Sequence, residues 1–316
     1  MDVLLIIAPA FAVILTGFIA VRTGLLPESL ADPLVTFAYF VCVPSLMFSI
    51  VARYPLEGLL GGDFWLAFGG GSVIALLILR FASGRLLGAD GRTRTVSAMT
   101  AVMANTGFVS LPLLYAIFGD RGVPPAAIAN IVIAAIMIPL AVMMLEATGG
   151  REGTALSPRR QALQILRNPM VWPTLLGFGF AWAHIPVPDV AERYLDILGQ
   201  GLTPCALFAI GASIRLTTLR REASRIVFMT VLKLAVIPGF VLGAGLLLEL
   251  DPFLLAAAVI CAASPSANTA YVLAMQYRTQ EEAVAAAISL STLIAIVTLP
   301  LWILLLAVLE PGLFPG

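Results

Sequence analysis

The chain has 316 residues, of which 60% are hydrophobic and only 11% are charged, and its formal net charge is zero. In soluble domains about a quarter of the residues are charged. This composition therefore excludes a soluble globular protein and predicts an all-α polytopic membrane protein. The absence of a basic patch excludes nucleic acid as a partner. Cys42, Cys205 and Cys261 lie in apolar stretches without metal-ligand spacing, and we interpret them as small buried hydrophobic residues.

Ten apolar segments long enough to cross a bilayer follow one another along the chain. They lie at 4–21, 30–52, 61–82, 96–118, 126–147, 165–184, 194–216, 224–248, 252–275 and 282–309. Asp2 precedes the first segment and Arg22 follows it, so we expect a transmembrane helix there and no cleaved signal peptide.

The arginines predict the orientation of these segments. Fourteen arginines follow odd-numbered segments, whereas only Arg53, Arg121 and Arg193 lie on the opposite side. Because basic loops stay in the cytoplasm, we expect both termini to be extracytoplasmic. The longest loop, 148–164, is the expected cytoplasmic linker between two halves, 1–147 and 165–316.

Short matches at a nearly constant separation of 160 to 163 residues predict an internal repeat. The matched positions are Pro9 and Pro169, Gly17 and Gly177, Pro44 and Pro204, Pro139 and Pro300, and Asn105 and Asn268. Because each half holds five segments, the second half enters the membrane from the other side. The repeats are therefore inverted, an arrangement typical of secondary transporters.

Polar residues interrupt segments four and nine near their centres. They are Asn105, Thr106 and Gly107 in segment four, and Ser264, Pro265, Ser266, Asn268 and Thr269 in segment nine. Irregular backbone at this depth requires a wet or protein-lined cavity. Two broken helices that cross there direct half-helix N-termini, each with about half a positive charge, at one small volume. We therefore predict an anion site, most simply for a carboxylate; polar contacts between packed helices are the alternative.

Lys233 is the one ionisable residue well inside a segment, about 12 Å beyond Arg225 along a helix. It is either a counter-charge or coupling group for an anionic substrate, or a side chain that snorkels to the membrane interface. Every Asp and Glu lies at a segment end or in a loop, which disfavours a proton antiporter with paired aspartates. Any Na⁺ site would have to use neutral oxygens.

Catalytic motifs are missing from the sequence. His184 is the only histidine, and there is no G-x-S-x-G elbow, aspartate dyad, metal-binding cluster, P-loop or dinucleotide fingerprint. We therefore expect neither an enzyme nor a bound cofactor or metal. The alternative to a transporter is a non-transporting membrane sensor or channel.

Four motifs resemble those of the auxin efflux carrier family, which includes bacterial malonate and malate carriers and the plant PIN auxin exporters. They are Met103–Leu113, Arg167–Gly177, Ala206–Ser213 and Ser264–Asn268. The resemblance covers essentially the whole chain. It departs from the plant carriers at Met170, where they have a second Asn, and in the short loop 148–164, which indicates a compact bacterial member in the inner membrane.

This resemblance implies ten helices in two inverted five-helix repeats with crossing broken helices, a bile-acid-symporter-like or NhaA-like fold. Segments 1, 2, 6 and 7 would form a scaffold and a homodimer interface. Segments 3–5 and 8–10 would form a transport domain that carries a small organic anion by an elevator motion, coupled to H⁺, to Na⁺ or to neither. Asn105 and Asn268 match the crossover asparagines of the family, and we expect the carboxylate between them to face Val43 and Ser45.

Overall fold

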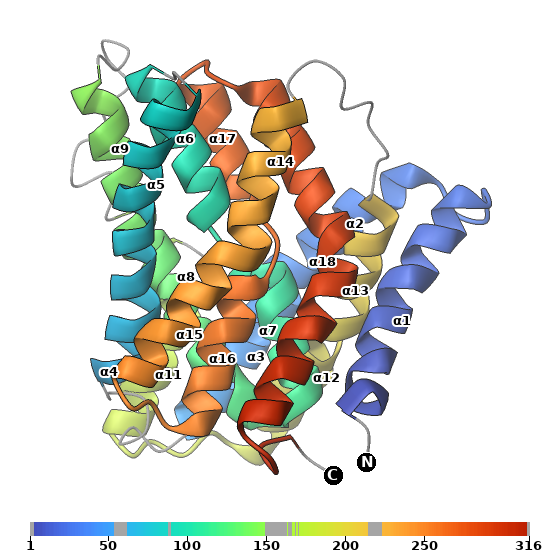
Figure 1. Ribbon diagram of the computed structural model, residues 1–316. Helices are drawn as coiled ribbons and strands as arrows, with labels where there is room; N and C mark the ends of the chain where they lie inside the picture. The colour runs from blue at the N-terminus through green and yellow to red at the C-terminus, as the bar shows by residue number, and fades with distance from the viewer. Residues whose placement is uncertain are drawn as a thin grey trace.

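The computed structural model describes residues 3–53, 62–87, 90–148, 163, 166–167, 169, 171–213 and 223–314. The predicted linker, 148–164, lies largely outside these ranges. Within them the chain is helical apart from turns and one isolated pair of extended residues (Figure 1). Six of the described helices are long and apolar enough to cross a membrane, and two shorter apolar helices accompany them. The structure is therefore that of an all-helical, multi-pass membrane protein, as the composition predicts.

In the first half of the chain, the helices lie on the expected apolar segments. They are α1 (Val3–Arg22), α2 (Ala31–Phe37), α3 (Val43–Arg53), α4 (Gly62–Phe64), α5 (Gly71–Leu87), α6 (Gly91–Val102), α7 (Leu111–Phe118), α8 (Val123–Val132) and α9 (Ile138–Ala147). Short 3₁₀ helices at Glu28–Leu30 and Gly119–Gly122 precede α2 and α8.

The second half contains α11 (Val171–Trp182), α12 (Asp189–Gln200), α13 (Leu202–Ser213), α14 (Ala223–Val231), α15 (Ile237–Leu247), α16 (Pro252–Ala263), α17 (Asn268–Gln276) and α18 (Glu281–Leu309). Three boundaries lie five residues outside the predicted segments. Helix α5 ends at Leu87 and not at 82, and α6 begins at Gly91 and not at 96. Segment seven is predicted from 194, whereas α12 already begins at Asp189. Its first turn carries Asp189 and Glu192, whose carboxylates complement the positive end of the helix dipole and extend the helix into a polar stretch.

Prolines determine where several helices widen. Four π-helical turns, at Ala38–Cys42, Thr106–Ser110, Ile133–Met137 and Leu232–Val236, each end two residues before a proline. A proline has no N–H, and its ring clashes with the carbonyl four residues earlier; a wider turn relieves that clash. The freed carbonyls then need other donors. The Trp302 indole, for example, donates to the Leu234 carbonyl at 2.8 Å.

The two helices that precede the breaks begin in the same way. The Asp90 carboxylate accepts from the Thr93 N–H at 3.0 Å and so caps α6. The Asp251 carboxylate caps α16 by accepting from the N–H groups of Phe253 and Leu254. Hydrogen bonds from the Thr93 side chain and backbone lower the pKa of Asp90 below its usual value. Both α6 and α16 then run for twelve residues before they end.

The contacts between helices divide them into two groups. In the first, α1 and α2 pack on α13, while α11 and α12 pack on α3. In the second, α5 packs on α6, α15 packs on α16, and α18 packs on α14 and α16. Contacts of α1 with α18, of α13 with α7 and of α3 with α8 join the groups. The first group comes from segments one, two, six and seven, and the second from the remaining segments.

Two glycines allow the backbones of α1 and α13 to touch. A Cβ on Gly17 would lie 2.1 Å from the Phe208 carbonyl oxygen, and one on Gly211 would lie 1.8 Å from that of Ile14. Both distances are too short for any side chain. Small residues allow such close approach between membrane helices, where dispersion and backbone contacts hold the pair together. Gly177 of α11 approaches α3 in a similar way, since its Cβ would lie 3.0 Å from that of Val51.

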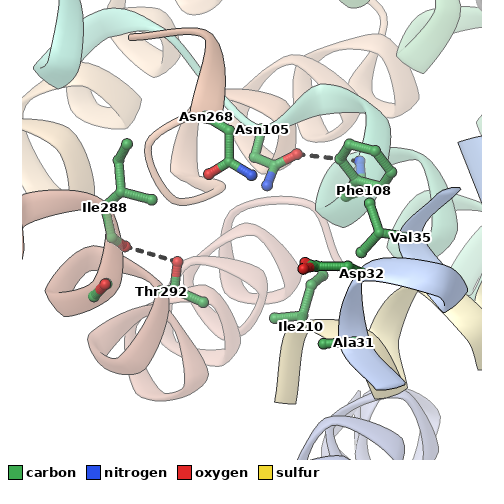
Figure 2. Close-up of a pocket in the computed structure, with 10 residues that line it drawn as sticks. Ala31, Asp32, Val35, Asn105, Phe108, Ile210, Asn268, Ile288 and Thr292 are labelled. Atoms are coloured by element: carbon green, nitrogen blue, oxygen red, sulfur yellow. Dashed lines mark hydrogen bonds between the residues drawn. The ribbon is translucent and has the colours of Figure 1, made fainter. Parts of the chain in front are cut away.

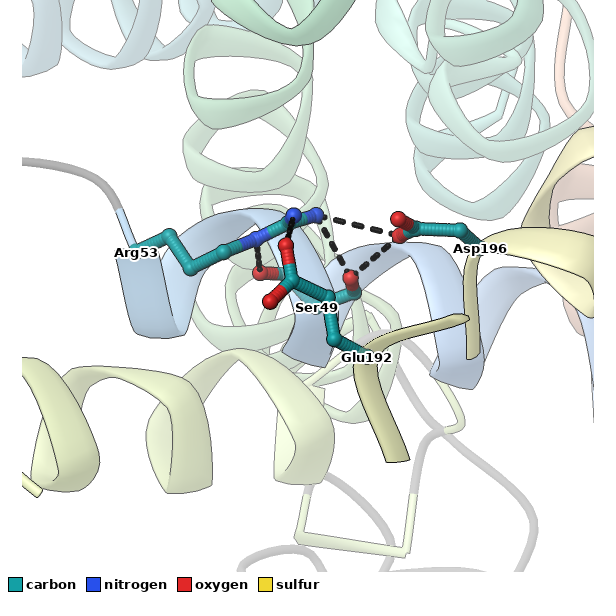
Figure 3. A network of polar contacts seen from close by, with 4 residues as sticks. All are labelled: Ser49, Arg53, Glu192 and Asp196. Atoms are coloured by element: carbon teal, nitrogen blue, oxygen red, sulfur yellow. Dashed lines mark hydrogen bonds and ion pairs between the residues drawn. The ribbon is translucent and has the colours of Figure 1, made fainter. Parts of the chain in front are cut away.

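Arg53, the last residue of α3, connects that helix to α12 (Figure 3). Its Nη2 donates to Ser49 Oγ at 2.7 Å and to Asp196 Oδ1 at 3.0 Å, and its Nη1 pairs with Glu192. The Ser49 hydroxyl donates in turn to Asp196 Oδ1 at 2.6 Å. Because the charged groups are about one-third exposed, the network contributes little free energy and mainly orients the polar face of α12 toward α3.

The α1–α13 contact predicts a specific cost for a single methyl group. We expect Gly211→Ala to lower the stability of the protein in detergent by about 1–3 kcal/mol, because the methyl group forces two backbones apart. Gly243→Ala in α15 is the matched control, since a Cβ there meets nothing within 4 Å. The control should keep or slightly raise the thermal unfolding midpoint. Equal midpoints for Gly211→Ala and the wild type would contradict the contact.

Candidate functional site

The two broken helices cross inside the second group of helices. Helix α6 ends at Val102 and α16 ends at Ala263. The residues that follow form an antiparallel bridge between Ala104 and Ser266. The Asn105 N–H donates to the Pro265 carbonyl at 2.9 Å, and the Ala267 N–H donates to the Met103 carbonyl at 3.0 Å. Each break thus satisfies backbone groups of the other, as buried backbone in a membrane requires.

Side chains satisfy the last-turn carbonyls of both half-helices. Ser266 Oγ donates to the Thr100 carbonyl of α6 at 2.7 Å. Lys233 Nζ donates to the Ala262 carbonyl of α16, also at 2.7 Å. A helix C-terminus carries about half a negative charge, so the amine of Lys233 lies where a positive charge is favoured.

Three further contacts tie the breaks to neighbouring helices. The hydroxyls of Ser110 and Ser264 lie 2.7 Å apart, which links the two breaks directly. The Ser266 N–H donates to the Ser291 hydroxyl of α18 at 3.2 Å. On the other side, the Thr106 hydroxyl donates to Asn130 Oδ1 of α8 at 3.1 Å. Helices α8 and α18 therefore each contribute a polar contact to the crossover.

The helical segments that continue beyond the breaks present their N-termini to a cavity. Asn105 Oδ1 caps the first of them by accepting from the Phe108 N–H at 3.1 Å. Asn268 begins α17. Figure 2 shows the amide groups of these two asparagines next to each other at the wall of the cavity. The pair of N-termini and the pair of amides therefore face one volume.

Two cavities meet at the asparagines. The larger has a volume of about 240 Å³ and is lined by Ala31, Asp32, Val35, Asn105, Phe108, Ile210, Asn268, Ile288, Ser289 and Thr292. The smaller has a volume of about 100 Å³ and is lined by Tyr39, Ala104, Asn105, Thr106, Gly107, Phe108, Asn130, Ile133, Ala134, Ile138, Ala267, Asn268 and Thr269. Asn105, Phe108 and Asn268 belong to both walls. The cavities have room for a molecule of small-metabolite size and no more.

The structure brings most of the predicted site residues together, but in two layers. Asn105, Thr106, Gly107, Asn268 and Thr269 line a cavity. The residues at the start of the second break lie behind them and hold the crossover instead: these are Ser264, Pro265 and Ser266.

The two residues predicted on segment two do not lie at a cavity wall. Val43 and Ser45 are buried in α3 and line neither cavity, and Ser45 Oγ donates to the Val41 carbonyl at 2.8 Å. Asp32, Val35 and Tyr39 line the cavities in their place. The π turn at Ala38–Cys42 separates the two sets. In a regular helix Val43 would follow Asp32, Val35 and Tyr39 on one face, and the extra residue in the π turn rotates it away by about 100°. Ser45 would lie on the opposite face of a regular helix from Val43, so it was not a candidate for the same face.

The snorkelling interpretation of Lys233 is also wrong. The side chain is fully buried (0% exposed) and ends on the Ala262 carbonyl, so it does not reach the membrane interface. Lys233 lines neither cavity, and its amine lies on the last turn of α16.

Of the lining residues that were not predicted from the sequence, Asp32 and Asn130 bear most on the chemistry of the site. Asp32 lies at a segment end, where carboxylates are common, yet its side chain points into the larger cavity (Figure 2). It contradicts the expectation that no carboxylate lies at the site. Asn130 is a lone amide inside the apolar segment 126–147, and polar residues inside membrane segments are rare and functional. That signal was available in the sequence.

Comparison with known proteins shows that the chain is similar to membrane transport proteins. The family model described as "Membrane transport protein" matches residues 2–303. A Rhizobium meliloti protein named "Putative malonate transporter" is 28% identical over 319 aligned residues, which cover 98% of each chain. An "Uncharacterized transporter" of Methanothermobacter thermautotrophicus is 26% identical and covers 92% of this chain and 93% of its own.

The family and these relatives are transporters and not enzymes. They also agree with the resemblance of the four sequence motifs. The chain therefore belongs to the membrane transport protein family, the family of the auxin efflux carriers.

Proposed function

We propose that this transporter carries a small organic anion across the bacterial inner membrane, with a carboxylate group held at the crossover. The observation that supports it is the joint position of Asn105 and Asn268, which line both cavities at the N-terminal ends of helical segments. Helix N-termini and amide N–H groups favour anions. Asp32 is the only charged residue among those that line the two cavities, so dipoles and amides would bind the anion without a full positive charge.

The name of the Rhizobium relative makes malonate the first substrate to test. A short dicarboxylate is compatible with cavities of about 240 and 100 Å³. Malate and an aromatic acid complete a panel that separates short acids from indole-like ones.

An inverted five-plus-five repeat is part of this proposal, and several contacts support it. Asp251 caps α16 161 residues after Asp90 caps α6. Asn130 and Ser291, also 161 residues apart, each bind one break. The two backbone hydrogen bonds run from residue 105 to 265 and from residue 267 to 103. Each becomes the other when residues 103 and 105 change places with their counterparts 265 and 267. We infer ten membrane spans with both termini outside the cytoplasm.

The two packing groups support an elevator motion, which is part of the same proposal. The scaffold would be the group of α1, α2, α3, α11, α12 and α13, which would also carry a homodimer interface. The transport domain would be the remaining helices, which contain both breaks. Coupling to H⁺ or Na⁺ belongs to the same proposal, with Asp32 at the cavity and Lys233 beside α16 as the candidate coupling groups.

The site assignment predicts that each crossover asparagine is needed for transport. We expect Asn105→Ala and Asn268→Ala to lower malonate counterflow in proteoliposomes by about tenfold or more, because each variant removes a hydrogen bond to a charged group. Expression should stay normal, and Gly243→Ala serves as the control. Wild-type counterflow in both variants would refute the site. Saturable counterflow also separates a carrier from a channel or a sensor, which show none.

The position of Lys233 predicts two separable effects. Lys233→Met leaves the Ala262 carbonyl unsatisfied, so we expect it to lose about 1–3 kcal/mol of stability in detergent. Lys233→Gln keeps a donor for that carbonyl but cannot titrate. We expect this variant to fold, with reduced counterflow that depends less on pH than that of the wild type. An unchanged rate and pH profile in Lys233→Gln would limit Lys233 to a structural role.

A further inference from the structure

Asn130 has a donor that the fold does not use. The side chain is 8% exposed, and its Oδ1 accepts from the Thr106 hydroxyl at 3.1 Å. Its Nδ2 has no hydrogen-bond partner among the described residues. A buried donor without a partner lowers stability, and each such group in a native structure requires an explanation.

The amide faces a cavity and not the packed core. Asn130 lines the smaller cavity, of about 100 Å³, together with Asn105, Asn268 and Thr269. No charged side chain belongs to that wall. A water molecule occupies about 30 Å³ in the liquid, so the cavity accommodates a group of a few heavy atoms. A carboxylate group has this size and offers only acceptors, which matches three amides that can all donate.

The corresponding residue of the other half has no donor to spare. Ser291 lies 161 residues after Asn130 and contacts the second break as Asn130 contacts the first. Its hydroxyl donates to the Ile288 carbonyl at 3.0 Å and accepts from the Ser266 N–H at 3.2 Å. The single hydroxyl proton of Ser291 is therefore used within the protein. The spare donor lies on one side of the crossover, beside Thr106.

We propose that Asn130 is a third substrate-binding amide, whose Nδ2 donates to a carboxylate oxygen of the substrate in the smaller cavity. The anionic group then lies on the α8 side of the crossover, and the rest of the substrate extends past the two asparagines into the larger cavity. Oδ1 of Asn130 stays bound to Thr106, which fixes the amide orientation and directs Nδ2 at the substrate. This inference rests on the proposed function. It adds Asn130 to the proposed site and places the anionic group on the α8 side of the crossover.

Asn130→Asp is the sharpest test, because it keeps an acceptor for Thr106 and replaces the amide donor with a negatively charged oxygen. We expect it to raise the KM for malonate counterflow about tenfold or more, with a smaller change in kcat, because an acceptor now faces the carboxylate. The malonate-induced rise of the thermal midpoint should be lost. The ligand-free midpoint should fall, because the new carboxylate is buried without a cationic partner, so the malonate-induced rise is measured from the ligand-free midpoint of each variant.

Two further comparisons distinguish a loss of substrate binding from a folding defect. Asn130→Ala and Thr106→Val break the same hydrogen bond, but only the first removes Nδ2, so its KM should rise further. Ser97→Ala is the matched control. Ser97 is also buried, and its side-chain oxygen has no hydrogen-bond partner in the part of the chain that the structure describes. It lines neither cavity, so its removal should leave uptake unchanged.

The outcomes distinguish this inference from the proposed function. A wild-type KM and a wild-type malonate shift in Asn130→Asp would overturn the role of Asn130, and so would equal effects of Asn130→Ala and Thr106→Val. If Asn105→Ala still abolished counterflow in that case, the proposed function would stand. If the wild type itself showed no counterflow and no thermal shift with any acid of the panel, both would fail.

Discussion

The pair of backbone hydrogen bonds between the two breaks determines how the rest of the molecule is arranged. A helix that is interrupted inside a membrane exposes N–H and C=O groups that lipid cannot satisfy. Here the Asn105 N–H and the Pro265 carbonyl satisfy each other, as do the Ala267 N–H and the Met103 carbonyl. Neither break is tolerable alone, because each supplies the partners of the other. Two broken helices at one depth are therefore required, and the proposed inverted repeat would provide them.

The same constraint separates the positive and negative helix ends. The two C-termini that enter the crossover point their carbonyls into the protein, where Ser266 and Lys233 donate to them. The two segments that leave the crossover begin at the cavity walls, beside Asn105 and Asn268. A molecule in the cavities thus meets N-termini and amides, while the negative helix ends are covered. This polarity arises from backbone geometry, so it needs no arginine or lysine in the site.

The sequence predicts the helices and the breaks because both follow from strong, local effects. Long apolar segments must be helical in a membrane, and Pro265 among small polar residues prevents a regular helix. It does not predict which face of a helix meets the cavity. That face depends on the π turn at Ala38–Cys42, which contains the cavity residue Tyr39 and displaces Val43, the next residue along the same face, from the site. The choice between the two interpretations of Lys233 likewise needed its burial and its partner, neither of which a single sequence contains.

The distribution of polar groups around the cavities bears on the proposed mechanism. The amides of Asn105, Asn130 and Asn268 all belong to the second packing group, which we assign to the transport domain. The first group contributes apolar side chains, the Tyr39 ring with its hydroxyl, and the Asp32 carboxylate, which repels an anion. An anion bound in this way makes its hydrogen bonds to one moving body. It can cross the membrane with that body and keep the same hydrogen-bond donors. If the donors were divided between both groups, some of the hydrogen bonds would have to break in every cycle. The one-sided position of the amides therefore favours an elevator motion over a rocking of the two groups about a fixed site.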